Sequence, residues 1–162
     1  MSTESPRARA LEGMRAGFAT RVIAAGIDVA IVFVALLAVL GGYAVVDYLV
    51  TSNPLELPDL GALWSGVAFS LLLIVVLTVA WSGSGRTLGN AFMGLRVLTE
   101  SGNRPTRRRA LLRAAIVVYI PAISMLWILV SRKNAGLHDL VCRTAVVYDW
   151  RVRPISQSRP PE

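Results

Sequence analysis

The sequence is poor in charge and nearly devoid of cysteine and histidine. Charged residues make up 17% of its 162 residues, whereas soluble globular chains carry about 25%. A single cysteine, Cys142, excludes a disulfide scaffold. The one histidine, His138, has no second His or Cys at metal-ligand spacing, which argues against zinc. Apolar residues reach 54%, with a mean hydropathy of +0.57. This composition indicates an integral membrane protein.

Two uninterrupted apolar runs are long enough to cross a bilayer. The first, Val22–Val46, has 25 residues, which is too long for the core of a signal peptide. The second, Ala62–Trp81, has 20 residues and no charge. The loop between them, residues 47–61, contains acidic residues but no basic one. A third run, Leu111–Val130, has Pro121 near its centre, where a missing backbone donor favours a helix break.

The basic residues predict how these runs are oriented. Four of the 17 lie up to Arg21, none in the 47–61 loop, six in residues 82–110 and six from Arg132 onward. The positive-inside rule therefore places the N-terminus and the 82–110 segment in the cytoplasm and the 47–61 loop outside. A plain third span would put the last six basic residues outside, whereas a re-entrant hairpin broken at Pro121 would return them. Both remain open, and the charge distribution favours the hairpin.

Two short segments, Leu95–Thr99 and Thr144–Tyr148, are typical of strands. Each is too short to be stable alone, so we expect them to pair, which requires one compartment. Thr87 is expected to cap a short interfacial helix that places Leu88, Phe92 and Leu95 on one face.

The predicted fold class is an all-α polytopic membrane protein with a small cytoplasmic β-pairing. It has two transmembrane helices and a third, Pro-broken hydrophobic segment. Residues 1–20 form a cytoplasmic N-terminal segment, 21–148 the membrane domain and 149–162 a flexible basic tail. We expect a multi-pass membrane protein with both termini in the cytoplasm.

Asp28 is the carboxylate that lies inside the first apolar run. An ionisable residue in a span is costly, so it is a functional candidate and should have a partner. Arg21 lies two turns earlier on the same face, about 10 Å along the axis. Arg113, at a matching shallow depth, is the preferred partner. The small residues 24–26 would let another helix approach closely. The pair either locks helix packing or serves a ligand or ion.

His138 and Asp139 are adjacent in a loop-like segment. Because no nucleophile is visible near them, a hydrogen-bonding turn is favoured over a catalytic dyad. Asp139 is expected to lie beside Gly94 or the short helix after Thr87, where it accepts hydrogen bonds from backbone or arginine groups. Cys142 is interpreted as a small apolar filler.

Three pieces of sequence occur in a specific order. They are Arg21–Asp28, then Thr87–Gly89 with Gly94–Val97, and finally Leu137–Asp139 leading to Thr144–Val147. Together they resemble the RDD family of small bacterial membrane proteins, named for one arginine and two aspartates. By this resemblance Arg21 is the family arginine, and Asp28 and Asp139 are the two aspartates. Leu112–Arg113 also resembles a recurrent pair of the family. Asn90 and Cys142–Arg143 depart from the family pattern.

The resemblance implies little about function: transport of unidentified ligands has been proposed for the family, and most members have no assigned biochemistry. The expected function is a transporter or membrane-complex subunit with an intramembrane Arg/Asp site. The alternative is a non-catalytic assembly or accessory protein that docks a partner through its basic cytoplasmic face. No enzyme activity, cofactor, metal or nucleic acid is expected. Three hydrophobic segments are too few to enclose a path, so we expect a homo-oligomer or larger complex in the lipid bilayer. The ligand or ion stays open.

Overall fold

The computed structural model describes residues 16–130 and 136–149, and the helices and strands lie within these ranges. In chain order they are α2 (Phe18–Thr51), α3 (Gly61–Gly83), α4 (Leu88–Phe92), β1 (Leu95–Thr99), α5 (Arg107–Tyr119), α6 (Pro121–Val130), α7 (Leu137–Cys142) and β2 (Thr144–Tyr148). Nearly all of the expected N-terminal segment and of the basic tail lies outside the described residues.

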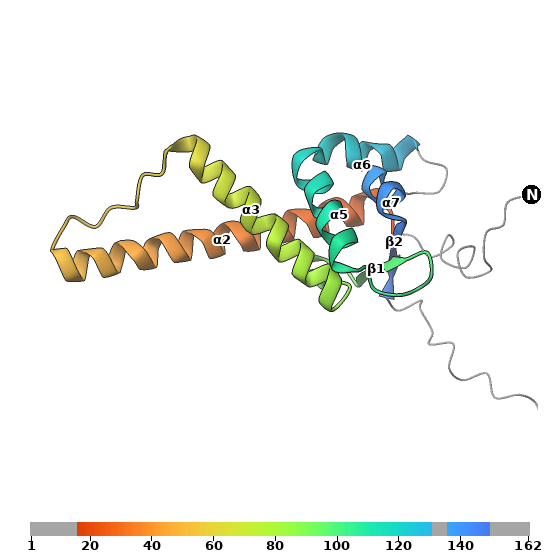
Figure 1. Cartoon of the computed structure of the whole chain (residues 1–162), viewed down its shortest axis with the longest axis horizontal. Coiled ribbons are helices and arrows are strands. Elements are labelled where there is room, and N and C mark those ends of the chain that lie inside the picture. The colour runs from red at the N-terminus through yellow and green to blue at the C-terminus, as the bar shows by residue number, and fades with distance from the viewer. Residues whose placement is uncertain (1–15, 131–135, 150–162) are drawn as a thin grey trace, which may run out of the picture.

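The two longest helices coincide with the first two apolar runs. α2 has 34 residues and α3 has 23, and both are long and apolar enough to cross a membrane. At 1.5 Å per residue they measure about 51 Å and about 34 Å, against about 30 Å for the hydrocarbon core. Most of their large apolar side chains are not covered by other parts of the protein, as expected for side chains that face lipid. Figure 1 shows α2 running along most of the molecule, with α5, α6, α7 and the two strands gathered where it begins.

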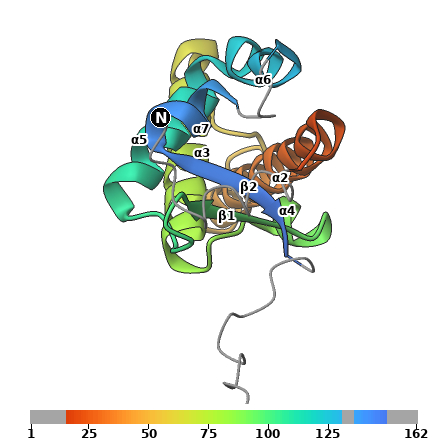
Figure 2. The same ribbon diagram turned by 90° about the vertical axis from the view of Figure 1, so that its right-hand side faces the viewer.

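The two short strands form a two-stranded antiparallel sheet. Leu95 pairs with Tyr148, Val97 with Val146 and Thr99 with Thr144. The strand bounds are those expected from the sequence. Gly94, at φ +64°, makes the turn from α4 into β1, a conformation that glycine adopts without steric cost. Figure 2 looks onto this end of the molecule, where the sheet lies beside α7 and the start of α2. The segments before α5 and after α7 therefore meet at one end.

The third apolar run is broken into two helices. α5 ends at Tyr119 and α6 begins at Pro121. Proline has no N–H and disfavours a helical residue before it. Ile120 accordingly leaves the helical region, with φ −129° and ψ 51°. In Figure 1, α5 rises beside α3 and α6 turns back toward the end that carries α7 and the sheet.

The apolar core lies where α2, α3, α5 and the sheet meet. Its small residues, Ala24 on α2 and Ala110 and Ala114 on α5, are almost completely buried and let the backbones approach closely. Leu77 and Trp81 of α3 fill the space between them. This core positions the polar groups described next.

Candidate functional site

A buried cluster of three charged side chains joins three helices. Arg21 comes from the first turn of α2, Arg113 from α5 and Asp139 from α7. Nη1 of Arg21 donates to Oδ2 of Asp139 at 2.5 Å, and Nη1 of Arg113 donates to Oδ1. The three residues are 6%, 2% and 1% exposed. One carboxylate thus receives a guanidinium on each oxygen.

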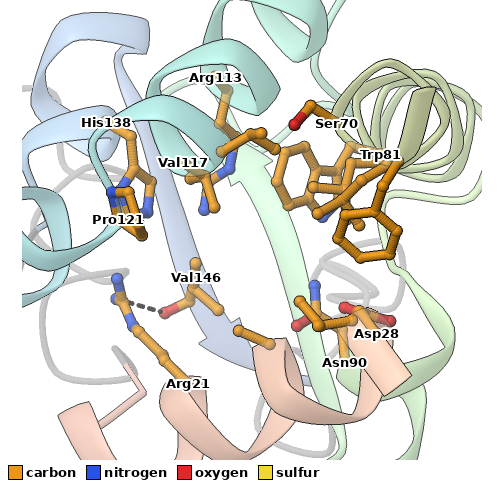
Figure 3. Close-up of a pocket in the computed structure, with 16 residues that line it drawn as sticks. Arg21, Asp28, Ser70, Trp81, Asn90, Arg113, Val117, Pro121, His138 and Val146 are labelled. Atoms are coloured by element: carbon orange, nitrogen blue, oxygen red, sulfur yellow. Dashed lines mark hydrogen bonds between the residues drawn. The ribbon is translucent and has the colours of Figure 1, made fainter. Parts of the chain in front are cut away.

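Both arginines of this Arg–Asp–Arg cluster also contact other parts of the chain. Arg21 donates from Nε to the carbonyl of Ala16 at 3.1 Å and from Nη2 to that of Val146 at 3.5 Å (Figure 3). Arg113 donates to the Thr144 hydroxyl at 2.6 Å, and its guanidinium lies 4.8 Å from the ring centroid of Trp81. The cluster therefore ties α2, α3, α5, α7 and β2 together.

The electrostatics of Asp139 are set by two opposing effects. Burial alone would raise the pKa of Asp139, but the positive charges of Arg113 and Arg21 outweigh it and hold this pKa well below its ordinary value. The N–H of Gly136 donates a further hydrogen bond at 3.1 Å. The hydrogen bonds expected of Asp139 are present, but the donors are on α2, α5 and just before α7, not beside Gly94 or on α4. Two guanidiniums and one carboxylate leave the cluster with one positive charge.

The expected ion pair between Arg113 and Asp28 does not form. Arg113 pairs with Asp139 instead, because α7 brings that carboxylate directly against α5. Asp28 accepts hydrogen bonds from the Thr87 hydroxyl at 2.5 Å and from the backbone N–H of Gly89 at 2.7 Å. Within residues 16–130 and 136–149, Asp28 forms no ion pair. Its partners are neutral groups of α4.

Helix α4 lies directly on the backbone of α2. A Cβ on Gly89 would stand 2.0 Å from the carbonyl oxygen of Ala24, so only glycine permits this contact. The expected cap is present, since Thr87 accepts a hydrogen bond from the N–H of Asn90 at 3.1 Å. The expected apolar face shared by Leu88, Phe92 and Leu95 is absent, because Leu95 is buried in the sheet while Leu88 and Phe92 are exposed. The sequence indicated a cap and a small-residue surface at Ala24, but not that they meet.

His138 is buried beside the cluster and bonded to α6. Its Nδ1 forms a hydrogen bond with the Ser124 hydroxyl, and its Nε2 lies 3.4 Å from Oδ1 of Asp139. Burial, and after it the positive charge of Arg113, lower the pKa of His138 to about 3, although the carboxylate of Asp139 acts in the opposite direction. The imidazole ring is therefore neutral at physiological pH, which agrees with a hydrogen-bonding role in the turn. Cys142 is 3% exposed, which fits a small filler. The described residues contain no group of three side chains suited to a metal ion.

His138 predicts an acid-sensitive stability. The folded state keeps the imidazole neutral down to about pH 3, whereas the unfolded chain binds a proton near pH 6.5. The contribution of His138 to the free energy of unfolding is therefore complete above pH 6.5 and decreases as the pH falls. At pH 5 the loss is about 2 kcal/mol. Thermal unfolding in detergent at pH 7 and pH 5 measures it. Because this is the only histidine, His138→Gln should reduce the difference between the two pH values. An equal difference in both proteins would contradict the assignment.

A cavity of about 310 Å³ opens beside these groups, between α2, α3 and α5 (Figure 3). It is lined by Arg21, Ala25, Asp28, Val29, Phe69, Ser70, Leu73, Leu77, Trp81, Asn90, Arg113, Val117, Val118, Pro121, His138 and Val146. Three of the four candidate residues, Arg21, Asp28 and Arg113, thus face one cavity, whereas Asp139 lies behind its wall. Trp81, near the end of α3, is 5% exposed and lies beneath Arg113.

The two apolar helices and the buried cluster define a class of small membrane proteins. In this class, ion pairs between arginine and aspartate connect the first long helix to a broken third apolar segment. The chain belongs to the RDD family, whose family model matches residues 15–143. This range includes Arg21, Asp28, Arg113 and Asp139. It confirms the family resemblance seen in the sequence.

One similar protein comes from Bacillus subtilis (strain 168) and is described as Uncharacterized protein YxaI. The two are 31% identical over 91 residues, a match that covers 49% of this chain and 58% of that protein. The matched part thus spans less than two thirds of the relative's length. No solved structure matches the chain.

Proposed function

We propose that this chain is the membrane-embedded unit of an oligomeric transporter or of a larger membrane complex, with Asp28 as the group that contacts the transported ion or ligand. The unit lies in the bacterial inner membrane. Its N-terminus and sheet are cytoplasmic, and the 47–61 loop is external. The absence of basic residues from that loop supports this orientation.

The broken third segment is a re-entrant hairpin in this proposal. β1 follows α3 and pairs with β2, which follows α7, so α5 and α6 together must return the chain to the side they left. Non-helical backbone at the Pro121 break is tolerated in a bilayer only when protein shields it. The packing of α5 on α3 supplies such protein. A plain third span would separate the paired strands.

The observation that carries the transport proposal is the state of Asp28. A carboxylate inside a span normally acquires a cationic partner. Here the two arginines that line the same cavity are bound to Asp139. Within the described part of the chain, the Asp28 oxygens accept hydrogen bonds only from neutral groups at the start of α4. The carboxylate lines the cavity and is half-buried. It is therefore placed to take a cation or a polar ligand.

A partner chain is needed to complete a path. The large side chains Val39 and Val50 of α2 and Leu63 of α3 are 68%, 78% and 73% exposed, so these helices cover little of one another. Arg107, Arg108 and Arg109 form an exposed basic start of α5 and favour the second candidate, an accessory protein docking a partner. In that case Asp28 would matter only for holding α4.

The test compares Asp28→Asn with Asp47→Asn, a control at the other end of α2. Asparagine retains an oxygen for the Gly89 N–H but cannot bind and release a cation as a carboxylate does. We expect both variants to reach normal abundance in the membrane. Everted vesicles carrying a pH gradient are challenged with sodium, potassium or calcium chloride.

Wild type and Asp47→Asn should show a cation-dependent change of the gradient, and Asp28→Asn should lose it. A normal response of Asp28→Asn would overturn the transport proposal and favour the accessory role. Loss of abundance only in Asp28→Asn would assign it a structural role through α4.

A further inference from the structure

The cavity runs from a polar end to an apolar end along the two long helices. Arg21, Arg113 and His138 lie at the end near the sheet. The other end reaches Phe69, whose ring packs edge-on against Phe33 at 6.2 Å. On α2 the cavity lining ends at Val29, eight residues beyond Arg21, or about 12 Å along the helix axis. The cavity therefore extends from the start of the first apolar run toward the middle of the span.

The side-chain amide of Asn90 lines the cavity. Asn90 is 8% exposed, and within the described ranges its carboxamide forms no hydrogen bond, although its backbone N–H bonds to Thr87. Figure 3 shows Asn90 beside Asp28 on the wall opposite Arg113, with its side chain directed into the cavity. A buried amide without a partner is costly, so it points to a ligand that supplies one.

The charge on the cavity wall is uneven. The hydrogen bonds that Arg113 makes within the described part of the chain come from Nη1, and its Nε has no partner. The Arg–Asp–Arg cluster keeps one positive charge, while the Asp28 oxygens on the opposite wall already accept two hydrogen bonds. An anionic group is therefore drawn toward Arg113, and the carboxamide of Asn90 can donate to it from the opposite wall.

We propose that this cavity binds an anionic amphiphile, with a carboxylate or phosphate head between Arg113 and Asn90 and one acyl chain along Leu73 toward Phe69. The volume lies at the lower end of ligand pockets, which suits a head and the first part of one chain. The position of the cavity along α2 suits a ligand that enters from the lipid and keeps its head group at the cytoplasmic interface. This inference rests on the membrane placement of the proposed function but not on transport.

Binding is measured on the purified full-length chain in detergent after delipidation. Native mass spectrometry and equilibrium titration use three probes: oleate, dioleoyl-phosphatidylglycerol and dioleoyl-phosphatidylcholine. We expect at least one anionic probe to bind at one site per chain, and phosphatidylcholine to bind at least tenfold more weakly. If only oleate binds, the ligand is a free fatty acid. If only phosphatidylglycerol binds, the ligand is a membrane lipid recognised by its headgroup. Equal binding of all three probes would overturn the anionic site.

Matched variants locate the site. Leu73 is 7% exposed and lines the cavity, whereas Leu71 on the same helix is 54% exposed and does not. Leu73→Trp should fill the cavity and abolish binding, while Leu71→Trp should bind as wild type does. Asn90→Ala keeps the cavity open but removes the amide, so we expect about tenfold weaker binding of the anionic probe.

If Leu73→Trp fails to fold, the affinity of Asn90→Ala for the anionic probe still tests the site. Unchanged affinity in Asn90→Ala, or in folded Leu73→Trp, would overturn the site. A normal cation response of Asp28→Asn together with intact probe binding would overturn the transport proposal and leave this inference standing, so the two proposals fail separately.

Discussion

Asp139→Asn is expected to remove most of the folded protein from the membrane. The variant would leave Arg21 and Arg113 facing one another with no carboxylate between them, in a site where all three residues are at most 6% exposed. Breaking a buried ion pair in this way typically costs about 3–5 kcal/mol. Native proteins have only about 5–15 kcal/mol of stability. Membrane abundance and the thermal midpoint in mild detergent measure the effect.

The chain contains a matched control for this substitution. Asp149 also accepts two arginines, Arg86 and Arg96, at 3.0 and 2.9 Å, but its side chain is 28% exposed. Ion pairs open to water contribute at most about 1 kcal/mol. Asp149→Asn should therefore lower the midpoint only slightly. Similar losses in the two variants would contradict the special role given to the buried cluster.

Gly89→Ala is the second substitution with a large expected effect. The added Cβ would lie 2.0 Å from the carbonyl oxygen of Ala24 and 3.0 Å from Cγ of Asp28. Because Ala24 contributes backbone rather than a movable side chain, α4 must shift away from α2. Overpacking costs about 1–3 kcal/mol, and weakening the hydrogen bond from the Gly89 N–H to Asp28 adds to it.

Gly26→Ala is the control, since a Cβ there meets nothing within 4 Å. Alanine is also the better helix former, so Gly26→Ala should be neutral or up to about 1 kcal/mol more stable. Thermal unfolding of the two variants in the same detergent provides the comparison. A Gly89→Ala midpoint equal to that of Gly26→Ala would show that α4 does not pack on α2 as described.

The elements of the fold follow from local sequence properties. Long apolar runs gave α2 and α3, Pro121 gave the break between α5 and α6, and two short strand-like segments gave β1 and β2. These features depend on a few neighbouring residues, which a single sequence displays directly. The register of the sheet and the side of the membrane are not local in this sense.

The partners within the site could not be predicted from the sequence. Arg113 was assigned to Asp28 on depth, yet Asp139 competes for it from 26 residues further along the chain. Asp28 is 61 residues from Gly89, whose donor is a backbone N–H and carries no side-chain signal. Which carboxylate an arginine finds depends on helix packing, so such pairs become visible only when the chain is folded.

The most direct test of this account is the accessibility of single cysteines in intact cells, in a Cys142→Ala background. The hairpin predicts that Glu56→Cys reacts with an impermeant thiol reagent, while Arg104→Cys and Ser156→Cys react only after the membrane is opened. Those two positions lie before α5 and after β2, so they report whether the third segment returns. Labelling of Glu56→Cys and Ser156→Cys together in intact cells would contradict the hairpin and require a third span.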